Sequence, residues 1–226
     1  MQRHNLLLNY FSAMHDALGP SNWWPGDSPF EIAVGAVLTQ NTNWGNVEKA
    51  MNNLRAEKLL TPAAMTTLTE NELAERIRPA GFFRLKSARL GNLLRFLRCR
   101  APSSEALSEP SLAFLREQDM DSLRDDLLNI KGIGPETADS ILLYALEYPS
   151  FVADAYTARL LHRHGHLPPD APYNELRDFF MDTLPPDVAT FNEYHALIVR
   201  VGKTWCKKSS PKCGECPLSS FLDQMP

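Results

Sequence analysis

The sequence is organised around residues 127–161, which read LLNIKGIGPETADSILLYALEYPSFVADAYTARLL. Apolar residues at helical spacing lie on both sides of a short turn, Lys131-Gly132-Ile133-Gly134. A helix cannot continue through this turn, because glycine weakens a helix and Pro135 has no N–H to donate. Pro135 does suit the first turn of a new helix, where that N–H would have no partner. The pattern predicts a helix, a tight hairpin and a second helix, with N–H groups in the turn that could hold a phosphate.

A carboxylate follows this hairpin in the segment Val152-Ala153-Asp154-Ala155-Tyr156, where an apolar run ends and another helix begins. Taken alone, Asp154 is most simply interpreted as the cap of that helix, since aspartate is a favoured N-cap residue. Its place after a hairpin that can grip a phosphate indicates a second role. Such an arrangement would hold a DNA strand against an acid.

The hairpin and the aspartate together resemble the helix-hairpin-helix DNA glycosylases of the endonuclease III superfamily, which carry a Gly-x-Gly hairpin followed by an aspartate. The resemblance implies that Lys131-Gly132-Ile133-Gly134 binds DNA, with a monovalent cation as a further ligand of the hairpin. It also implies that Asp154 is the catalytic carboxylate. Where bifunctional members of the family carry a lysine, this chain has Glu136.

The chain has 226 residues, of which 44% are apolar and 22% are charged, and this suits one or two compact domains. It contains no run of about eighteen apolar residues, which a membrane-spanning helix would need. We interpret the first nineteen residues as an amphipathic helix rather than a signal peptide, because they lack a small-residue cleavage site. Four cysteines in a chain without a secretory signal favour a reducing compartment. We therefore expect a cytoplasmic, nucleoid-associated protein of bacterial type.

The formal net charge is −4, which does not by itself indicate a DNA-binding protein. The positive charges are nevertheless segregated. Residues 83–104 and 199–214 contain arginine and lysine but no acid, whereas acids gather between residues 117 and 126. A run of charge is often only a solvated face, but a one-sided distribution is also what phosphate contacts require.

Helical spacing of apolar residues recurs along the chain, and alternating strand patterns are almost absent, so the class is all-α. The pattern predicts helices over residues 3–18, 28–40, 43–55, 70–78, 84–98, 111–115, 121–130, 135–146, 154–164, 172–183 and 187–204. The family resemblance implies two helical lobes. One is a six-helix barrel over residues 20–147, with the helix-hairpin-helix motif at 121–146. The other is formed by residues 1–19 and 148–226, with a cysteine-rich loop at 206–216.

Aromatic residues follow the first and the second predicted helix. Trp23 and Trp24 are adjacent and cannot both face one core, so one of them could cover a loop, or they could stack on a flipped base. Trp44 lies just beyond the second helix and could wall the same pocket. We expect these three residues, with Glu136 and Lys203, to line the base pocket. Lys203 is included because the resembling glycosylases place a lysine at this point.

Two further positions would probe the duplex. Leu38-Thr39-Gln40-Asn41-Thr42 ends an apolar helix, and in the resembling family the glutamine of such a run enters the gap left by the extruded nucleotide. Gln40 matches that residue, although polar residues at a helix junction can simply be caps. Phe82 follows Pro79-Ala80-Gly81 and matches the apolar tip that wedges into the duplex, or it is a hydrophobic staple for the next helix.

Three cysteines near the C-terminus stand at the spacing C-x6-C-x2-C, namely Cys206, Cys213 and Cys216. Thiols at this spacing in a reducing compartment indicate a metal site, because they would otherwise be exposed to oxidation. The residues alone leave zinc and a relic loop open. The resemblance implies a structural [4Fe–4S] cluster bound as C-x6-C-x2-C-x5-C. The fourth position is Leu222, which cannot bind iron, while Asp223 follows it and Cys99 is far away in the sequence.

Cleaving an N-glycosidic bond develops positive charge on the sugar, which a carboxylate such as Asp154 can stabilise. A lysine would instead form a Schiff base and permit strand cleavage, which Glu136 cannot do. We therefore expect a monofunctional glycosylase without AP lyase activity, acting as a monomer on double-stranded DNA with a damaged base.

The motifs at 23–25, 35–42, 78–82 and 131–139 most resemble the bacterial 3-methyladenine DNA glycosylases of the endonuclease III type. This implies an alkylated purine as the substrate, although the cysteine cluster departs from that group. An aromatic pocket fits, because a methylated purine is cationic and gains cation–π energy of ~1–2 kcal/mol. Two alternatives stay open: a glycosylase for oxidised pyrimidines or mispaired bases, and a non-catalytic protein that binds DNA structure.

Overall fold

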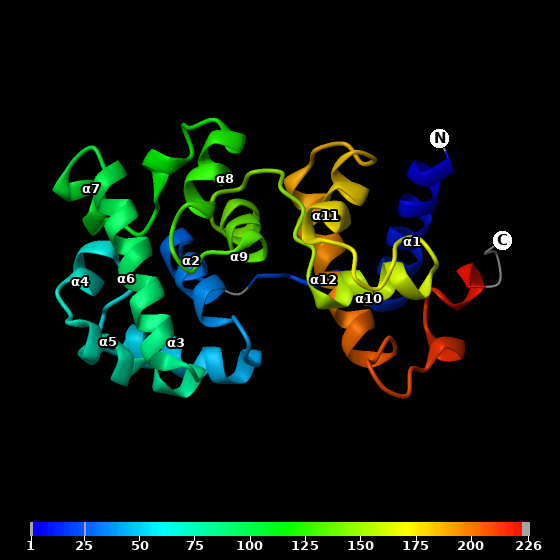
Figure 1. Cartoon of the computed structure of the whole chain (residues 1–226), viewed down its shortest axis with the longest axis horizontal. Coiled ribbons are helices and arrows are strands. Elements are labelled where there is room, and N and C mark those ends of the chain that lie inside the picture. Colours follow the sequence, from blue (N-terminus) through cyan, green and yellow to red (C-terminus); the bar gives the residue numbers. More distant parts are fainter. Residues whose placement is uncertain (1, 25, 223–226) are drawn as a thin grey trace. The chain divides into compact units, whose positions relative to one another are not determined.

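The secondary structure in the described part of the chain is entirely helical, which confirms the all-α class (Figure 1). The computed structural model describes residues 2–24 and 26–222. The chain divides into two compact units. One is the continuous segment Trp24–Tyr148, and the other combines Met1–Trp23 with Pro149–Pro226. Among the described residues, we find no helix with the length and apolar character needed to cross a membrane.

The continuous unit is built around α2 (Pro29–Leu38), of which eight of the ten residues are buried. A helix that is apolar on most sides must be surrounded by other elements. Its neighbours are α3 (Trp44–Ala56), α6 (Phe83–Arg100), α9 (Pro135–Ser140) and a π-helical turn (Ile141–Ala145). The unit is completed by α4 (Pro62–Thr66), α5 (Glu70–Arg76), α7 (Ser104–Ser108), α8 (Met120–Leu128) and two 3-10 turns, Arg78–Ala80 and Ala113–Leu115.

Side-chain caps fix where several of these helices begin. Ser28, Asn43 and Thr69 each accept a hydrogen bond from a backbone N–H in the first turn of α2, α3 and α5. Each cap satisfies an N–H that has no partner inside its helix. The sequence does not predict α4 and α7, because five residues are too few to display a helical period. The helix predicted over residues 111–115 is only a 3-10 turn.

The helix predicted over residues 135–146 changes character halfway. It begins as α9 and continues as the π-helical turn, in which the Leu146 N–H donates to the Ile141 carbonyl over 3.1 Å. Such turns are rare and are frequently found at functional sites. This one carries Tyr144.

The second unit packs α1 (Gln2–Leu18) and α10 (Ala155–Arg163) against α12 (Val188–Thr204). Phe180, from α11 (Tyr173–Met181), stacks on Phe151 with ring centroids 3.9 Å apart inside an aromatic core. The helices α10 and α12 approach closely at Gly202, where an added Cβ would lie 2.3 Å from the Tyr156 ring. Beyond α12, the 3-10 turns Cys213–Glu215 and Ser219–Phe221 form the cysteine-rich segment.

Candidate functional site

The predicted hairpin connects α8 to α9, and its shape depends on Gly132. This residue has a φ of 99°, and a Cβ added there would lie 2.4 Å from Arg89 Cγ. The Ile133 N–H donates to the Ile130 carbonyl (2.9 Å), and the Ile133 side chain is buried. Gly134 starts α9 without a side-chain cap, unlike the residues that start α2, α3 and α5. A phosphate at the turn glycines would therefore be bound by backbone groups.

Side chains from α6 and from the end of α2 hold the hairpin in place. Gln40 Nε2 donates to the Gly132 carbonyl (3.1 Å), and Arg89 donates to Gln40 Oε1. Asn92 Nδ2 donates to the Lys131 carbonyl (2.8 Å). Gln40, the residue expected to probe the duplex, is thus also a partner of the hairpin. The sequence pointed to Arg89 only as part of the basic segment 83–104 and did not indicate Asn92, although their three-residue separation puts them on one face of a helix.

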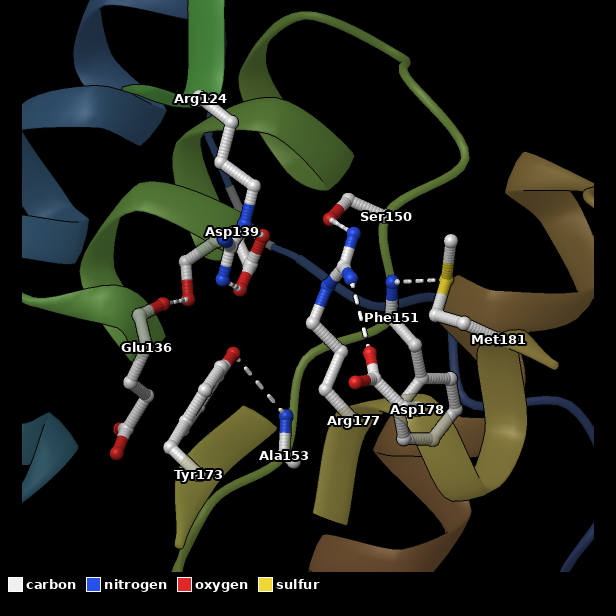
Figure 2. A network of polar contacts seen from close by, with 11 residues as sticks. Arg124, Glu136, Asp139, Ser150, Phe151, Ala153, Tyr173, Arg177, Asp178 and Met181 are labelled. Carbon is white, nitrogen blue, oxygen red and sulfur yellow. Dashed lines mark hydrogen bonds and ion pairs between the residues drawn. The ribbon is translucent and has the colours of Figure 1, made fainter. Parts of the chain in front are cut away.

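A buried ion pair joins the two helices of the hairpin motif (Figure 2). Arg124 on α8 donates to both carboxylate oxygens of Asp139 on α9, over 2.8 and 3.0 Å. Asp139 is fully buried. Because removal of either partner would leave an uncompensated charge in the interior, this pair fixes how the two helices meet.

Phe82 forms an exposed apolar tip at the start of α6. Its side chain is 67% exposed and its φ is 46°, a left-handed conformation that bulky residues seldom adopt. Backbone strain of this kind clusters at functional sites. The exposure does not fit the alternative of a hydrophobic staple, whose side chain would pack against the helix.

Lys86, one of the basic residues of segment 83–104, is buried. The interpretation of this segment as an exposed charged face, whether solvated or bound to phosphate, is therefore wrong for Lys86. Lys86 is 1% exposed, and its Nζ donates to the carbonyls of Leu38 (2.8 Å) and Ala80 (2.7 Å). Burial, with a contribution from the nearby charge of Arg89, lowers the pKa of Lys86 to about 8. Lys86 thereby ties the end of α2, just before Gln40, to the turn that precedes Phe82.

The residues predicted to line the base pocket fall into two groups. In the continuous unit, Trp24 stacks on Tyr144 with ring centroids 4.9 Å apart and meets Trp44 edge-on at 5.4 Å. In the other unit, Lys203 Nζ lies 5.8 Å from the centroid of the Trp23 ring. Tyr144 could not be found from the sequence, since an aromatic residue on a buried helix is usually only part of the core.

Trp24 and Trp44 line a pocket within the continuous unit. Its wall also carries three carboxylates and one guanidinium, from Asp27, Glu31, Glu48 and Arg55. Arg55 pairs with Glu31 and lies 3.6 Å from Asp27, so negative charge remains in excess. The structure places Glu136 elsewhere, in the first turn of α9, where its carbonyl accepts a hydrogen bond from Ser140 Oγ (2.7 Å; Figure 2).

Asp154 is the N-cap residue of α10. Its Oδ1 accepts the N–H groups of Tyr156 and Thr157, both at 2.9 Å, and its Oδ2 lies 3.6 Å from His195 Nε2 on α12. Burial alone would raise the pKa of Asp154, but His195 and the bonds from Thr157 outweigh it, so the pKa lies below its usual value. The carboxylate is therefore ionised at neutral pH. Capping occupies Oδ1 and leaves Oδ2 for another task.

The segment before Asp154 is held by α11 (Figure 2). Arg177 Nη2 donates to Ser150 Oγ (3.2 Å), and the Ala153 N–H donates to Tyr173 Oη (3.5 Å). Polar groups of an irregular buried segment need such partners. These contacts fix the point at which the chain turns into α10 and hence the place of Asp154.

The three predicted metal-binding cysteines line one pocket. The rest of the wall is mainly apolar and comes from Leu160, Arg163, His164, Val201, Trp205, Leu218 and Leu222. Arg163 Nη1 lies 3.1 Å from Cys206 Sγ. The residues present thus suit a thiolate-bound group. Leu222 offers no ligand atom, Cys99 is exposed on α6, and Asp223 lies outside the described residues.

Within residues 2–24 and 26–222, no group of three His, Cys, Asp or Glu side chains could hold a single metal ion. An iron–sulfur cluster differs, because its ligands bind separate iron atoms and need not converge on one point.

Comparison with known proteins agrees with this geometry. The family model described as HhH-GPD superfamily base excision DNA repair protein matches residues 34–186, and the iron–sulfur binding domain of endonuclease III matches residues 206–221. A Methanocaldococcus jannaschii protein, whose name places it among DNA repair glycosylases, is 42% identical over 97% of this chain and 96% of its own length. Endonuclease III of Thermotoga maritima is 27% identical over 86% of this chain and 83% of its own.

Solved structures give the same result. An endonuclease III–DNA complex shares the fold with a TM-score of 0.78 at 23% identity, covering 96% of this chain and 94% of that one. The 3-methyladenine DNA glycosylase MagIII of H. pylori, bound to 1,N6-ethenoadenine, has a TM-score of 0.72 at 28% identity, covering 89% and 97%. The C-terminal segment is an iron–sulfur binding domain. The chain belongs to the HhH-GPD superfamily of base excision DNA repair proteins and is a DNA glycosylase of the endonuclease III type, as the hairpin motif predicts.

Proposed function

We propose that the chain is a monofunctional glycosylase, which hydrolyses the bond between an alkylated purine, such as 3-methyladenine, and its sugar and leaves an abasic site. The observation that carries this proposal is the ionised Asp154 carboxylate, with Oδ1 fixed by two backbone N–H groups and Oδ2 free of such bonds. In this role Oδ2 stabilises the positive charge that develops on the sugar and orients the attacking water.

The hairpin, Gln40 and Phe82 serve to extract the nucleotide in this proposal. The backbone of residues 131–134 binds a phosphate, while the exposed Phe82 enters the base stack beside the lesion. Unstacking a base costs a few kcal/mol, and an inserted aromatic ring offsets part of that cost. Gln40 is already bound to the hairpin, so its amide would reach the duplex together with the phosphate-binding turn.

The absence of strand cleavage rests on Glu136. A bifunctional glycosylase needs an amine that attacks the sugar to give a Schiff base, and a carboxylate cannot form one. Hydrolysis by water, promoted by Asp154, then ends at the abasic site.

An alkylated purine is favoured by the charge around Trp24 and Trp44. The pocket that these rings line holds three carboxylates against one guanidinium, and this excess of negative charge attracts a cationic base. Indole faces add cation–π attraction, which a neutral oxidised pyrimidine would not gain. The similarity to a 3-methyladenine DNA glycosylase supports the same substrate class.

The test uses end-labelled duplexes with one lesion each: 3-methyladenine, an oxidised pyrimidine or a G·T mispair. We expect breaks in the 3-methyladenine strand only after alkali treatment. Breaks without alkali would contradict the monofunctional mechanism, and faster release of an oxidised or mispaired base would contradict the substrate.

The variant Asp154→Asn keeps the capping oxygen but removes the charge. We expect single-turnover release to fall by about 10²–10³-fold, the usual effect of removing one electrostatic stabiliser, while affinity for an abasic-site duplex is retained. Full activity in this variant would show that Asp154 is only a helix cap.

A further inference from the structure

We propose that the imidazole of His164 is the fourth protein ligand of the iron–sulfur cluster, at the corner that no cysteine serves. Clusters of this kind are normally held by four protein ligands, and histidine replaces cysteine in some of them. The C-terminal segment supplies three thiols, and the residue at the spacing of a fourth is Leu222.

His164 lies where such a ligand is needed. It follows the last residue of α10 and is 5% exposed, and it lines the same pocket as Cys206, Cys213 and Cys216. Among the other described residues on that wall, only Arg163 and Trp205 have side chains that contain nitrogen. A guanidinium stays protonated and an indole N–H donates only, so neither can bind iron. His164 is the one remaining donor on the pocket wall.

The contacts of the ring leave one nitrogen for the cluster. His164 Nδ1 lies 2.8 Å from Tyr10 Oη, and Tyr10 Oη lies 3.0 Å from His166 Nε2. With Nδ1–H donated to Tyr10, the tyrosine O–H donates to His166, and the His164 Nε2 lone pair is left for iron. A histidine that binds metal commonly donates its other N–H to such a partner, which fixes its tautomer and the orientation of the ring.

The Tyr10 side chain is itself held in place. Its ring is 2% exposed and meets the Phe221 ring edge-on, with centroids 4.9 Å apart. Phe221 comes from the same segment as the cysteines, so the fold of the cysteine-rich loop and the position of the His164 ring are linked through Tyr10. An imidazole in place of a thiolate removes one negative charge from the site, which raises the reduction potential of the cluster.

The test uses the full chain, reconstituted anaerobically with iron and sulfide and then reduced. Pulsed electron paramagnetic resonance of the wild type should show hyperfine coupling to one nitrogen directly bound to iron, which changes to the ¹⁵N pattern after labelling with ¹⁵N-histidine. The variant His164→Ala should lose this coupling. The variant His164→Cys should lose it too, while it keeps the full iron content and titrates at a lower potential than the wild type. The matched control His166→Gln should keep the coupling.

The proposal is overturned if the reduced wild-type cluster shows no bound nitrogen, or if the coupling persists in His164→Ala. It is equally overturned if His164→Cys binds no cluster although circular dichroism shows it folded. None of these readouts uses glycosylase activity, so they are independent of the lesion that the protein removes.

Discussion

His195 Nε2 on α12 lies 3.6 Å from Oδ2 of Asp154, the oxygen that the α10 backbone does not use. The imidazole is buried, with 4% exposure. The carboxylate is thus flanked by a helix N-terminus on one oxygen and by a histidine beside the other. Both neighbours favour the charged form of the acid.

The variant His195→Ala should shift the pH dependence of base release. Because His195 helps to hold the pKa of Asp154 low, its loss should raise that pKa. Because the carboxylate must be ionised to act, the acid limb of the kcat/KM profile should then move to higher pH. The rate on the plateau should change much less. The control His162→Ala removes an exposed histidine of α10 and should leave the profile unchanged. An unshifted acid limb in His195→Ala would contradict the role given to His195.

Replacing Gly132 by alanine should damage the hairpin. The new Cβ would have to displace Arg89, and the positive φ adds strain of about 1–3 kcal/mol. We expect a lower free energy of unfolding and weaker binding to an abasic-site duplex. Gly134 is the matched control, because its φ is −95° and nothing lies within 4 Å of an added Cβ. The variant Gly134→Ala should fold and bind almost normally. Equal effects in both variants would show that the geometry of Gly132 is not what matters.

Shortening Phe82 to alanine should reduce function without reducing stability. Phe82 is 67% exposed and buries little apolar surface in the free protein. The free energy of unfolding should therefore change by less than about 0.5 kcal/mol. Loss of a stacking aromatic ring costs about 1–3 kcal/mol per base, so affinity for damaged duplex should fall about tenfold to a hundredfold. Leu8, another exposed apolar residue, serves as the control, and Leu8→Ala should bind as the wild type does.

The variant Lys86→Met should flatten the dependence of stability on alkaline pH. The pKa of Lys86 is lowered from 10.5 to about 8 in the folded chain, so between these values the unfolded state binds more protons. Stability from this group therefore rises with pH across that window. Urea denaturation at several pH values should show this rise in the wild type and not in Lys86→Met. The carbonyls of Leu38 and Ala80 would also lose their donor, which costs about 1–3 kcal/mol each where they stay buried. The exposed Lys49→Met is the control.

The parts of the fold that follow from local rules could be predicted from the sequence. Glycine and proline at the hairpin, the helical spacing on either side and the three cysteines each act through near neighbours along the chain, so the all-α class and the family follow from them. Long-range pairings could not be predicted. His195 meets Asp154 only because α12 packs on α10, and Tyr144 meets Trp24 although the two residues are far apart in the sequence.

Lys86 illustrates why a charge run is an uncertain signal. Arginines lie close to it on both sides, at positions 84 and 89, and nothing local distinguishes Lys86 from these other basic residues. It is buried because two chain segments end near it and present carbonyls without helical donors, a condition that exists only in the folded unit.

The unit that carries Asp154 combines both ends of the chain. The buried residues Leu7, Tyr10 and Met14 belong to α1, which packs on α12. When α1 leaves the ribosome, α12 has not yet been synthesised, so the apolar face of α1 lacks its partner until most of the chain exists. The unit over Trp24–Tyr148 has no such delay, and domains made first generally fold first. A newly made chain would therefore hold a finished hairpin while α1 still needs protection from aggregation, and the aspartate would reach its final surroundings only after α12 has been made.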